Sequence, residues 1–106
     1  MLFRSMAVTF ILDSGVERNA DTPDTFQIPS EEKRTGLKRD DLAKLIFRIQ
    51  IDDEEHVERM WVRVTEILPE YYVGLLDNDP ICTNEIRSGM TVVFHSDHVI
   101  QIDHIR

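Results

Sequence analysis

Three histidines and a carboxylate lie close together near the C-terminal end of the chain: His95, Asp97, His98 and His104. Imidazole nitrogens and carboxylate oxygens bind zinc and other divalent ions, so this set is a candidate metal site or the centre of a small hydrolase. On a continuous strand, however, His95 and His98 point to opposite faces because the interval between them is odd. They converge only if the chain turns at Ser96 and Asp97. The alternative is a solvated turn that carries surface histidines.

The one cysteine and the acidic runs are weaker candidates for chemistry. Cys82 is the only possible thiol nucleophile, but nothing nearby in the sequence supplies the base that lowers a thiol pKa, so a small apolar side chain is the preferred interpretation. The runs DDEEH (52–56) and DNDP (77–80) lack the glycine pivot and spaced oxygen ligands of a calcium loop. Phosphate-binding glycine loops, GxSxG elbows and HExxH motifs do not occur. No catalytic residue and no cofactor is therefore predicted.

Aromatic side chains in two neighbouring strand candidates suggest a surface for protein contacts. If the strands form a hairpin, Trp61 and one of the pair Tyr71 and Tyr72 share a face beside Arg63, which makes an amphipathic patch typical of interfaces. For Trp61 a place in the core is the preferred alternative. One of the two tyrosines must face outward, because neighbouring residues of a strand alternate.

The stretch GLLDNDP, residues 74–80, ends the second of these strands. Gly74 permits a bulge or close backbone approach. Asn78 and Asp79 favour an Asx-type turn, and Asp79 is held extended by the proline after it. We expect a strand that ends in a shaped turn, where Asn78 presents its amide to a partner.

Short strands dominate the predicted elements. Alternation of apolar residues, with β-branched and aromatic enrichment, predicts strands at 7–13, 42–52, 59–68 and 71–79, and a closing pair within 90–105 hinged at Ser96 and Asp97. In the second strand Leu45, Phe47, Ile49 and Ile51 share the apolar face, and Ile46 interrupts the alternation. In the third, Met60, Val62 and Val64 share one face, and Trp61, Arg63, Thr65 and Ile67 share the other.

One short helix is predicted from Glu31 to Thr35, because Ser30 is a good N-cap, two glutamates follow it and Gly36 is a natural stop. We expect residues 14–25 to be a loop of low order, 52–58 an acidic connector, and 80–89 a connection with a helical turn at 84–87.

Two segments echo each other: LKRDDLAKLIF (37–47) and IRSGMTVVF (86–94). Each has an aliphatic residue, a basic residue, a turn and then a strand that ends in phenylalanine, and Gly89 occupies the place of Asp40. We therefore predict one α+β domain spanning 1–106, with an N-terminal strand and loop (1–24) and a core (25–106). Its short antiparallel strands form a curved sheet or SH3-like partial barrel, with one short helix.

Charge and length limit the possible partners. The net charge is −8, with 20 acidic residues against 12 Lys and Arg, and no dense basic stripe is present, so nucleic acid is not an expected partner. The apolar run 6–12 is too short for a signal-peptide core or a membrane span, so we expect no membrane contact and a cytoplasmic location. A single cysteine agrees with a reducing compartment. Met6 is an alternative start.

The ordered set MWV (60–62), then Gly74, Leu76, Asn78 and Pro80, then Gly89, Val92, Phe94 and Ile100, together with KLIF (44–47), resembles a small bacterial family of YegJ-like proteins of unknown function. The resemblance covers about residues 25–105. Met90 departs from it, standing where an acid is expected. The resemblance implies a compact domain and supplies no catalytic residues.

Three functions follow as hypotheses. The first is an accessory or protein-binding domain without catalytic activity, which uses Trp61, Arg63, Tyr71, Tyr72 and Asn78. The second is a metal-binding protein or hydrolase that uses the C-terminal histidines, with Cys82 or the DNDP acids. The third is an immunity-type inhibitor of a basic partner protein, which the charge of −8 permits. The oligomeric state is open.

Overall fold

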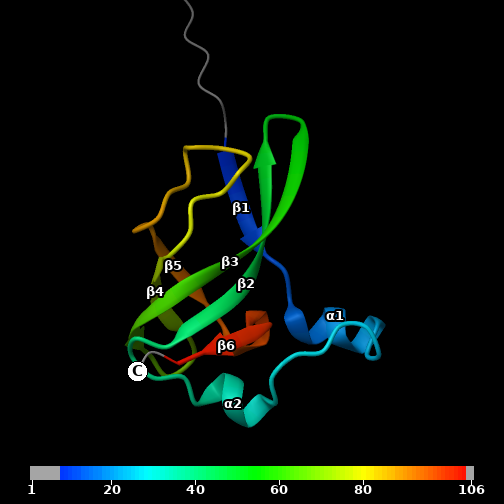
Figure 1. Cartoon of the computed structure of the whole chain (residues 1–106), viewed down its shortest axis with the longest axis vertical. Helices are drawn as coiled ribbons and strands as arrows, with labels where there is room; N and C mark the ends of the chain where they lie inside the picture. Colours follow the sequence, from blue (N-terminus) through cyan, green and yellow to red (C-terminus); the bar gives the residue numbers. More distant parts are fainter. Residues whose placement is uncertain (1–7, 105–106) are drawn as a thin grey trace, which may run out of the picture.

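The strands form one antiparallel sheet that curls into a half-barrel (Figure 1), seen in a computed structural model that describes residues 8–104. They are β1 (Val8–Leu12), β2 (Leu42–Ile51), β3 (Glu54–Ile67), β4 (Tyr72–Leu76), β5 (Thr91–Phe94) and β6 (Gln101–Asp103). They pair in the order β1-β2-β3-β4-β5. Strand β6 pairs with the first residues of β2, and β1 pairs with the last residues of β2 along the same edge. The predicted α+β class with a curved sheet is confirmed. The predicted first residue of β1, Ala7, lies outside the described residues.

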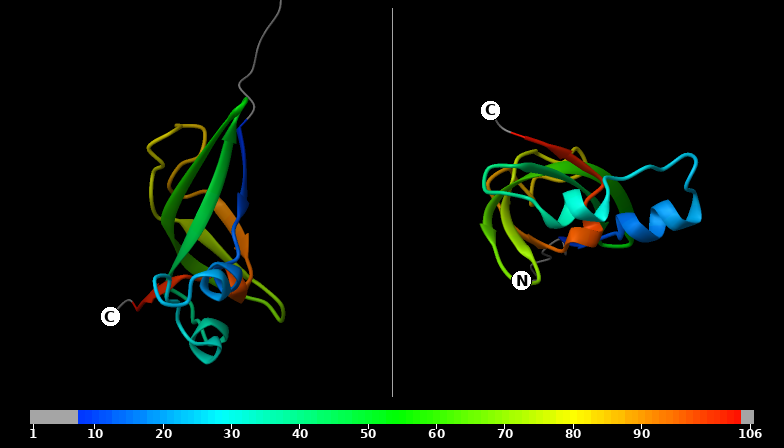
Figure 2. Two further views of the ribbon diagram at one scale, coloured as in Figure 1. Left: turned by 90° about the vertical axis from the view of Figure 1, so that its right-hand side faces the viewer. Right: turned by 90° about the horizontal axis from the view of Figure 1, so that it is seen from below.

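Three short helical segments gather at one end of the sheet, beside β6 (Figure 2). They are α1 (Gly15–Asp21), α2 (Glu31–Thr35) and the 3₁₀ turn η1 (Ser96–His98). The prediction of α2 is confirmed: the Ser30 hydroxyl accepts a hydrogen bond from the Lys33 N–H at 3.3 Å, and Gly36 ends the helix. Among residues 8–104 no helix has the length and apolar character needed to cross a membrane.

The expectation of a loop over 14–25 was wrong, because α1 forms there. The Ser14 side chain caps it by accepting the Glu17 N–H at 3.1 Å. The spacing Ser-x-x-Glu is the signature of a capping box, so the signal was present in the sequence. Gly15 lets the helix lie against η1 and the chain after it, because an added Cβ would come within 2.8 Å of Ile100.

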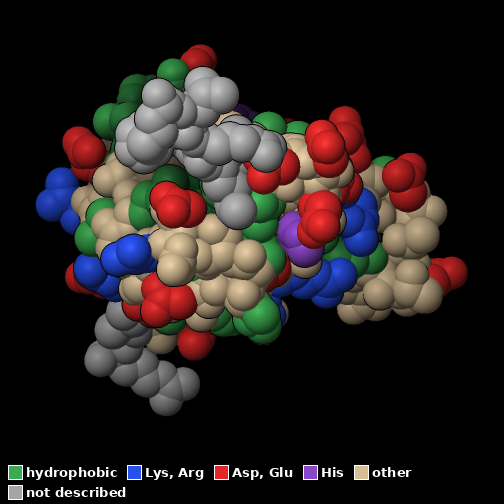
Figure 3. Space-filling view, turned by 90° about the horizontal axis from the view of Figure 1, so that it is seen from above, with side chains coloured by type: hydrophobic (Ala, Val, Ile, Leu, Met, Phe, Trp, Pro, Cys, Tyr) green, Lys and Arg blue, Asp and Glu red, His purple; other side chains and the backbone are tan. Residues whose placement is uncertain are grey.

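The acidic stretch 52–58 was also wrongly expected to be a connector. Only Asp52 and Asp53 form the turn, and β3 begins at Glu54, opposite Ile51. Asp52 adopts a positive φ of 51°, as tight two-residue hairpin turns require. The charges of this stretch are tolerated because the end of the hairpin projects into solvent, where Figure 3 shows acidic side chains spread over the surface.

The core fills the concave side of the half-barrel. The alternation predicted for most of β2 and β3 is confirmed, since the inward residues are 3% exposed or less, apart from Ile51 at the end of β2, which is partly buried against the core. Trp61 points to the outer face and is only partly buried, so the preferred core interpretation of this residue was wrong. Ile46, which interrupts the β2 pattern, is buried on the outer face instead. The inward cluster is Leu45, Phe47, Ile49, Met60, Val62, Val64, Tyr72, Leu76, Val92 and Phe94, with Leu37, Ala43, Ile86 and Val99.

A β-bulge in β3 resets the alternation near its end. Val64 pairs with Gly74 and Glu66 with Val73, so Thr65 is the extra residue. Beyond the bulge Ile67 stands opposite the inward-facing Tyr72. Ile67 therefore leaves the outer face on which the sequence pattern had placed it and lies at the mouth of the half-barrel.

The two echoing segments form matching turns. The N–H of Asp41 donates to the Lys38 carbonyl and the N–H of Met90 to the Arg87 carbonyl, both at 3.1 Å. The residue before each has a positive φ, 74° at Asp40 and 93° at Gly89. The first turn docks on Val64 of β3 and the second on Leu76 of β4 through pairs of backbone hydrogen bonds of 2.7–2.9 Å. The sequence echo therefore reflects a repeated local structure that starts β2 and β5.

Gly74 is the position in β4 that tolerates no side chain. A Cβ there would lie 2.5 Å from Val62 Cγ1 and 2.6 Å from the Arg63 carbonyl oxygen. We expect Gly74→Ala to lower the free energy of unfolding by about 1–3 kcal/mol, because backbone as well as side chain must shift. Gly36→Ala is the control for urea denaturation, since its nearest atom is 3.1 Å away and its φ is negative. Equal midpoints for both variants would contradict the close approach.

Candidate functional site

The chain does turn where the two closely spaced histidines require it. The 3₁₀ turn η1 brings the rings of His95 and His98 to 6.4 Å between centroids. Each ring uses its Nδ1 to accept a backbone hydrogen bond: the His98 ring from the His95 N–H at 3.0 Å, and the His95 ring from the Asp97 N–H at 3.1 Å. In their neutral forms both rings therefore carry the proton on Nε2. The two histidines act as caps of a turn.

The remaining members of the candidate metal set each have a partner outside it, although the Asp97 carboxylate also lies 3.8 Å from the His95 Nδ1. The His104 Nδ1 is 2.9 Å from the buried carboxylate of Asp41, and Asp97 pairs with Arg34 at 3.4 Å. Within residues 8–104 no three His, Cys, Asp or Glu side chains are grouped so that they could hold a metal ion. The geometry therefore does not assemble His95, Asp97, His98 and His104 into one site.

Arg34 holds the 3₁₀ turn to α2. Its side chain is almost fully buried and donates to the carbonyls of Pro29 at 3.0 Å and Ser96 at 3.3 Å. Its own carbonyl accepts a hydrogen bond from the Tyr72 hydroxyl at 2.9 Å, and the Tyr72 hydroxyl oxygen in turn accepts the Leu37 N–H at 3.4 Å. One buried cation and one buried phenol thus tie α2, η1 and β4 together.

Cys82 lies beside a carboxylate that disfavours its thiolate. Burial of the thiol, with the hydrogen bond and negative charge of Glu58, raises the pKa of Cys82 to about 11. The Glu58 side chain accepts the backbone N–H groups of Ile81 and Cys82 at 2.9 and 3.0 Å. Although burial opposes it, these hydrogen bonds hold the pKa of Glu58 below its ordinary value. The pair anchors the loop after β4 and leaves Cys82 a poor nucleophile.

The stretch 77–80 is a clamp for that same loop. The Asn78 Oδ1 accepts the Trp61 N–H at 2.5 Å, and the Asp79 carboxylate accepts the Ser88 N–H at 2.8 Å. The amide of Asn78 therefore bonds across to β3 rather than to its own turn. The helical turn expected at 84–87 is absent, because the chain makes only bends there.

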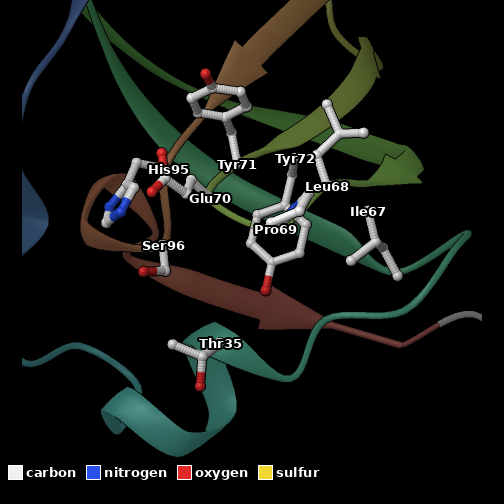
Figure 4. A pocket seen from close by; sticks show the side chains of 9 residues that line it. All are labelled: Thr35, Ile67, Leu68, Pro69, Glu70, Tyr71, Tyr72, His95 and Ser96. Atoms are coloured by element: carbon white, nitrogen blue, oxygen red, sulfur yellow. The ribbon is translucent and has the colours of Figure 1, made fainter.

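A groove, which we call the hairpin groove, opens where β3 turns into β4. Its volume is about 510 Å³. Figure 4 shows Tyr71 and Tyr72 pointing to opposite sides, with Tyr72 directed toward α2. Tyr71 is 47% exposed, whereas Tyr72 is 5% exposed. Only Tyr71 of the pair is accessible to a partner. The lining residues are Thr35, Ile67, Leu68, Pro69, Glu70, Tyr71, Tyr72, His95 and Ser96.

The structure separates Trp61 and Arg63 from this groove. Both lie on the outer face of β3, and Trp61 is ten residues before Tyr71, around the hairpin turn. At about 3.3 Å per residue, the strand from Trp61 to Ile67 spans roughly 20 Å. The Lys44 ammonium covers the Trp61 ring at 5.4 Å, and Arg63 pairs with Asp40 at 3.2 Å. The predicted aromatic patch is thus two separate surfaces.

A second hollow, which we call the β6 crevice, was missed by sequence reasoning. It runs between β6 and the chain from 25 to 36, with one part of about 760 Å³ and an adjoining part of about 160 Å³. Lys44 and Arg59 line its smaller part, and His104 lines the larger. Strand alternation did place Lys44 on a polar face. No local pattern signalled that residues 25–29 would cover that face.

Comparisons with known proteins identify a family. A family model described as an uncharacterised protein conserved in bacteria (DUF2314) matches residues 13–103. The resemblance to a bacterial family of unknown function is thereby confirmed, and the match begins at residue 13, just before α1, rather than at about residue 25. Neither the curated proteins nor the solved structures gave a match to the chain.

The clamp at Asn78 has a measurable consequence. Asn78→Ala leaves the partly buried Trp61 N–H without its acceptor, so the free energy of unfolding should fall by about 1–3 kcal/mol. Asn78→Asp keeps an acceptor oxygen and should lose less. Asn84→Ala, in the exposed bends of the same loop, serves as the control in urea denaturation. An unchanged midpoint for Asn78→Ala would exclude the clamp.

The cap at His98 predicts a pH dependence of stability. Burial, with the nearby charge of His95, lowers the pKa of His98 below its ordinary 6.5, although Asp97 opposes the shift. The unfolded chain then binds this proton more tightly than the folded chain. The stabilising contribution is complete above pH 6.5 and is lost as the pH falls from there to the folded-state pKa.

We expect His98→Asn to flatten the fall in thermal midpoint below pH 6.5, whereas His56→Asn, at a partly exposed position paired with Glu54, should leave it in place. An identical pH profile for wild type and His98→Asn would contradict the role of this ring.

Proposed function

We propose that this chain, which belongs to the bacterial family of uncharacterised proteins, is a protein-binding accessory domain without catalytic activity. Its contact surface in this proposal is the hairpin groove. The single observation that carries the proposal is the accessible apolar cluster at the β3–β4 turn. Ile67, Leu68 and Tyr71 are 49%, 37% and 47% exposed, lie within five residues and line one groove. Contiguous exposed apolar side chains of this kind are typical of interaction sites.

Tyr71 is the anchor residue of the proposed contact. A tyrosine offers a large, rigid ring and a polar hydroxyl, and it is enriched among the residues that dominate binding energy. Its neighbour Tyr72 is held in the core by Arg34 and Leu37. The backbone at Tyr71 is therefore held in place by the buried side chain of its neighbour Tyr72. A partner that binds Tyr71 loses less entropy, because this part of the surface is already ordered.

The charge of the chain indicates the kind of partner. The net charge is −8, and Glu70 lines the groove between Pro69 and Tyr71. An apolar patch with an acidic residue in an acidic protein favours a partner whose surface is apolar and basic, and the long-range field speeds their encounter. Inhibition of a basic partner protein is one form that such binding takes.

His95, His98 and Cys82 support the absence of catalysis in this proposal. The Nδ1 atoms of His95 and His98 both accept backbone hydrogen bonds, and the thiol pKa of Cys82 is raised to about 11. A general base or nucleophile at neutral pH needs the opposite arrangement, with a free lone pair or a lowered thiol pKa.

A photo-crosslinking amino acid at position 71 tests the proposal in bacterial cells that express the chain. We expect a discrete higher-mass adduct from position 71 and none from position 81. Ile81 is the matched control because its side chain is 96% exposed, the highest value among the large apolar residues of 8–104, yet it lies outside the groove. Glu70→Lys combined with the crosslinker at 71 should weaken the adduct. No adduct, or the same adducts from 71 and 81, would overturn the proposal.

A further inference from the structure

The β6 crevice lies on a surface distinct from the hairpin groove. Its two parts share the lining residues Gln27, Ile100 and Gln101, so they adjoin each other. Figure 2 shows β6 beside the helical segments at the end of the molecule opposite the β2–β3 hairpin. Ile28, Pro29 and Ile102 supply apolar walls, and the amides of Gln27 and Gln101 supply polar groups. Such a lining suits a chain that has both apolar and polar side chains.

One wall of the crevice is an unpaired strand edge. β6 pairs with Leu42, Ala43 and Lys44 of β2, and within residues 8–104 no other strand pairs with it. A strand edge carries backbone N–H and C=O groups that readily accept an added strand. Because Gln101 and Ile102 both line the crevice, a chain lying in it runs along β6.

The charge lining the crevice is opposite in sign to the net charge of the molecule. Lys33, Lys44 and Arg59 line it, and none of them forms an ion pair within the described residues. Glu32 is the one acidic side chain in the lining. The chain as a whole carries −8. Three cations against one carboxylate therefore make a local positive site in an acidic protein, which favours an acidic occupant.

Aromatic rings hold two of these cations in place. Lys44 lies over Trp61 at 5.4 Å, and Arg59 lies over Phe26 at 5.3 Å. Lys44 pairs across the strands with Trp61, and Arg59 is two residues before Trp61 on the same outer face, so the two cations are diagonal neighbours. Cations stacked on rings are already ordered, so a partner loses less entropy in binding them.

We propose that the β6 crevice binds an extended acidic peptide segment of a partner protein, which adds to the free edge of β6 as a further strand. Side chains of a strand alternate in direction. One set of the peptide's side chains then packs on Ile28, Ile100 and Ile102, while the carboxylates of the other set lie on the face of the sheet that carries Lys44 and Arg59. The backbone supplies affinity and the carboxylates supply specificity.

The test uses fluorescein-labelled heptapeptides and fluorescence anisotropy with the whole chain. A peptide of alternating valine and glutamate should bind, and added salt should weaken it. The same peptide with lysine for glutamate should bind at least tenfold more weakly. A version N-methylated along one edge should lose binding, because it cannot pair with β6.

Variants locate the contact. Lys44→Gln and Arg59→Gln should each weaken the glutamate peptide about two- to fivefold, as expected for the loss of one exposed ion pair. Arg87→Gln makes the same charge change in the exposed loop before β5 and should leave affinity unchanged. Amide NMR shifts should cluster at 101–103, and their hydrogen exchange should slow on binding.

Several results would overturn the inference: equal binding of the lysine or N-methylated peptide, shifts confined to the hairpin groove, no binding at millimolar peptide, or occupation of the β6 edge by a second copy of the chain. The crosslinking test at position 71 reports on a different surface, so either proposal can fail while the other stands.

Discussion

The close approach of β4 to β3 at Gly74 is the constraint on which the rest of the structure depends. No Cβ fits between this residue, the Val62 side chain and the Arg63 carbonyl. The bulge at Thr65 immediately follows in the ladder and increases the local twist. Together they curl the sheet into a half-barrel with Tyr72 inside and Ile67 at its mouth. Without the bulge Glu66, rather than Ile67, would face the groove.

The inward position of Tyr72 then organises the open end of the half-barrel. Its hydroxyl reaches the Arg34 carbonyl and the Leu37 N–H, and Arg34 continues the connection to the carbonyl of Ser96. These bonds join residues more than 30 positions apart in the chain and leave no buried side-chain nitrogen or oxygen unsatisfied among the described residues. The same connection forms the floor of the hairpin groove and fixes α2, which is one wall of the β6 crevice.

The residues that first suggest chemistry make structural contacts. His95 and His98 cap a turn, Asp97 pairs with Arg34, and Glu58 holds the loop that contains Cys82. The accessible features are an apolar groove with an acidic residue and a cationic crevice beside a free strand edge. Two surfaces of opposite character favour a domain that meets other polypeptides, in agreement with the function proposed.

Local features were predictable from the sequence because they depend on neighbouring residues. Period-two alternation located most of β2, β3 and β4, and Ser30 with Gly36 set the limits of α2. The matching pattern around Asp40 and Gly89 predicted two similar turns, and both residues adopt a positive φ in the structure. Even α1 carried its signal, in Ser14 and Glu17. Backbone dihedrals and helix caps depend on residues within about four positions, so the local sequence is enough to predict these features.

Tertiary structure alone decided which of these residues meet. The choice between Tyr71 and Tyr72, the shift of Ile67 by the bulge, and the separation of His104 from His95 all depend on strand register and on contacts across many residues. The pairing of Arg34 with Asp97 joins positions 63 apart. The β6 crevice exists only because residues 25–36 lie across from β6. Packing of distant segments has no periodic signature in a single sequence, and the candidate sites were decided by that packing.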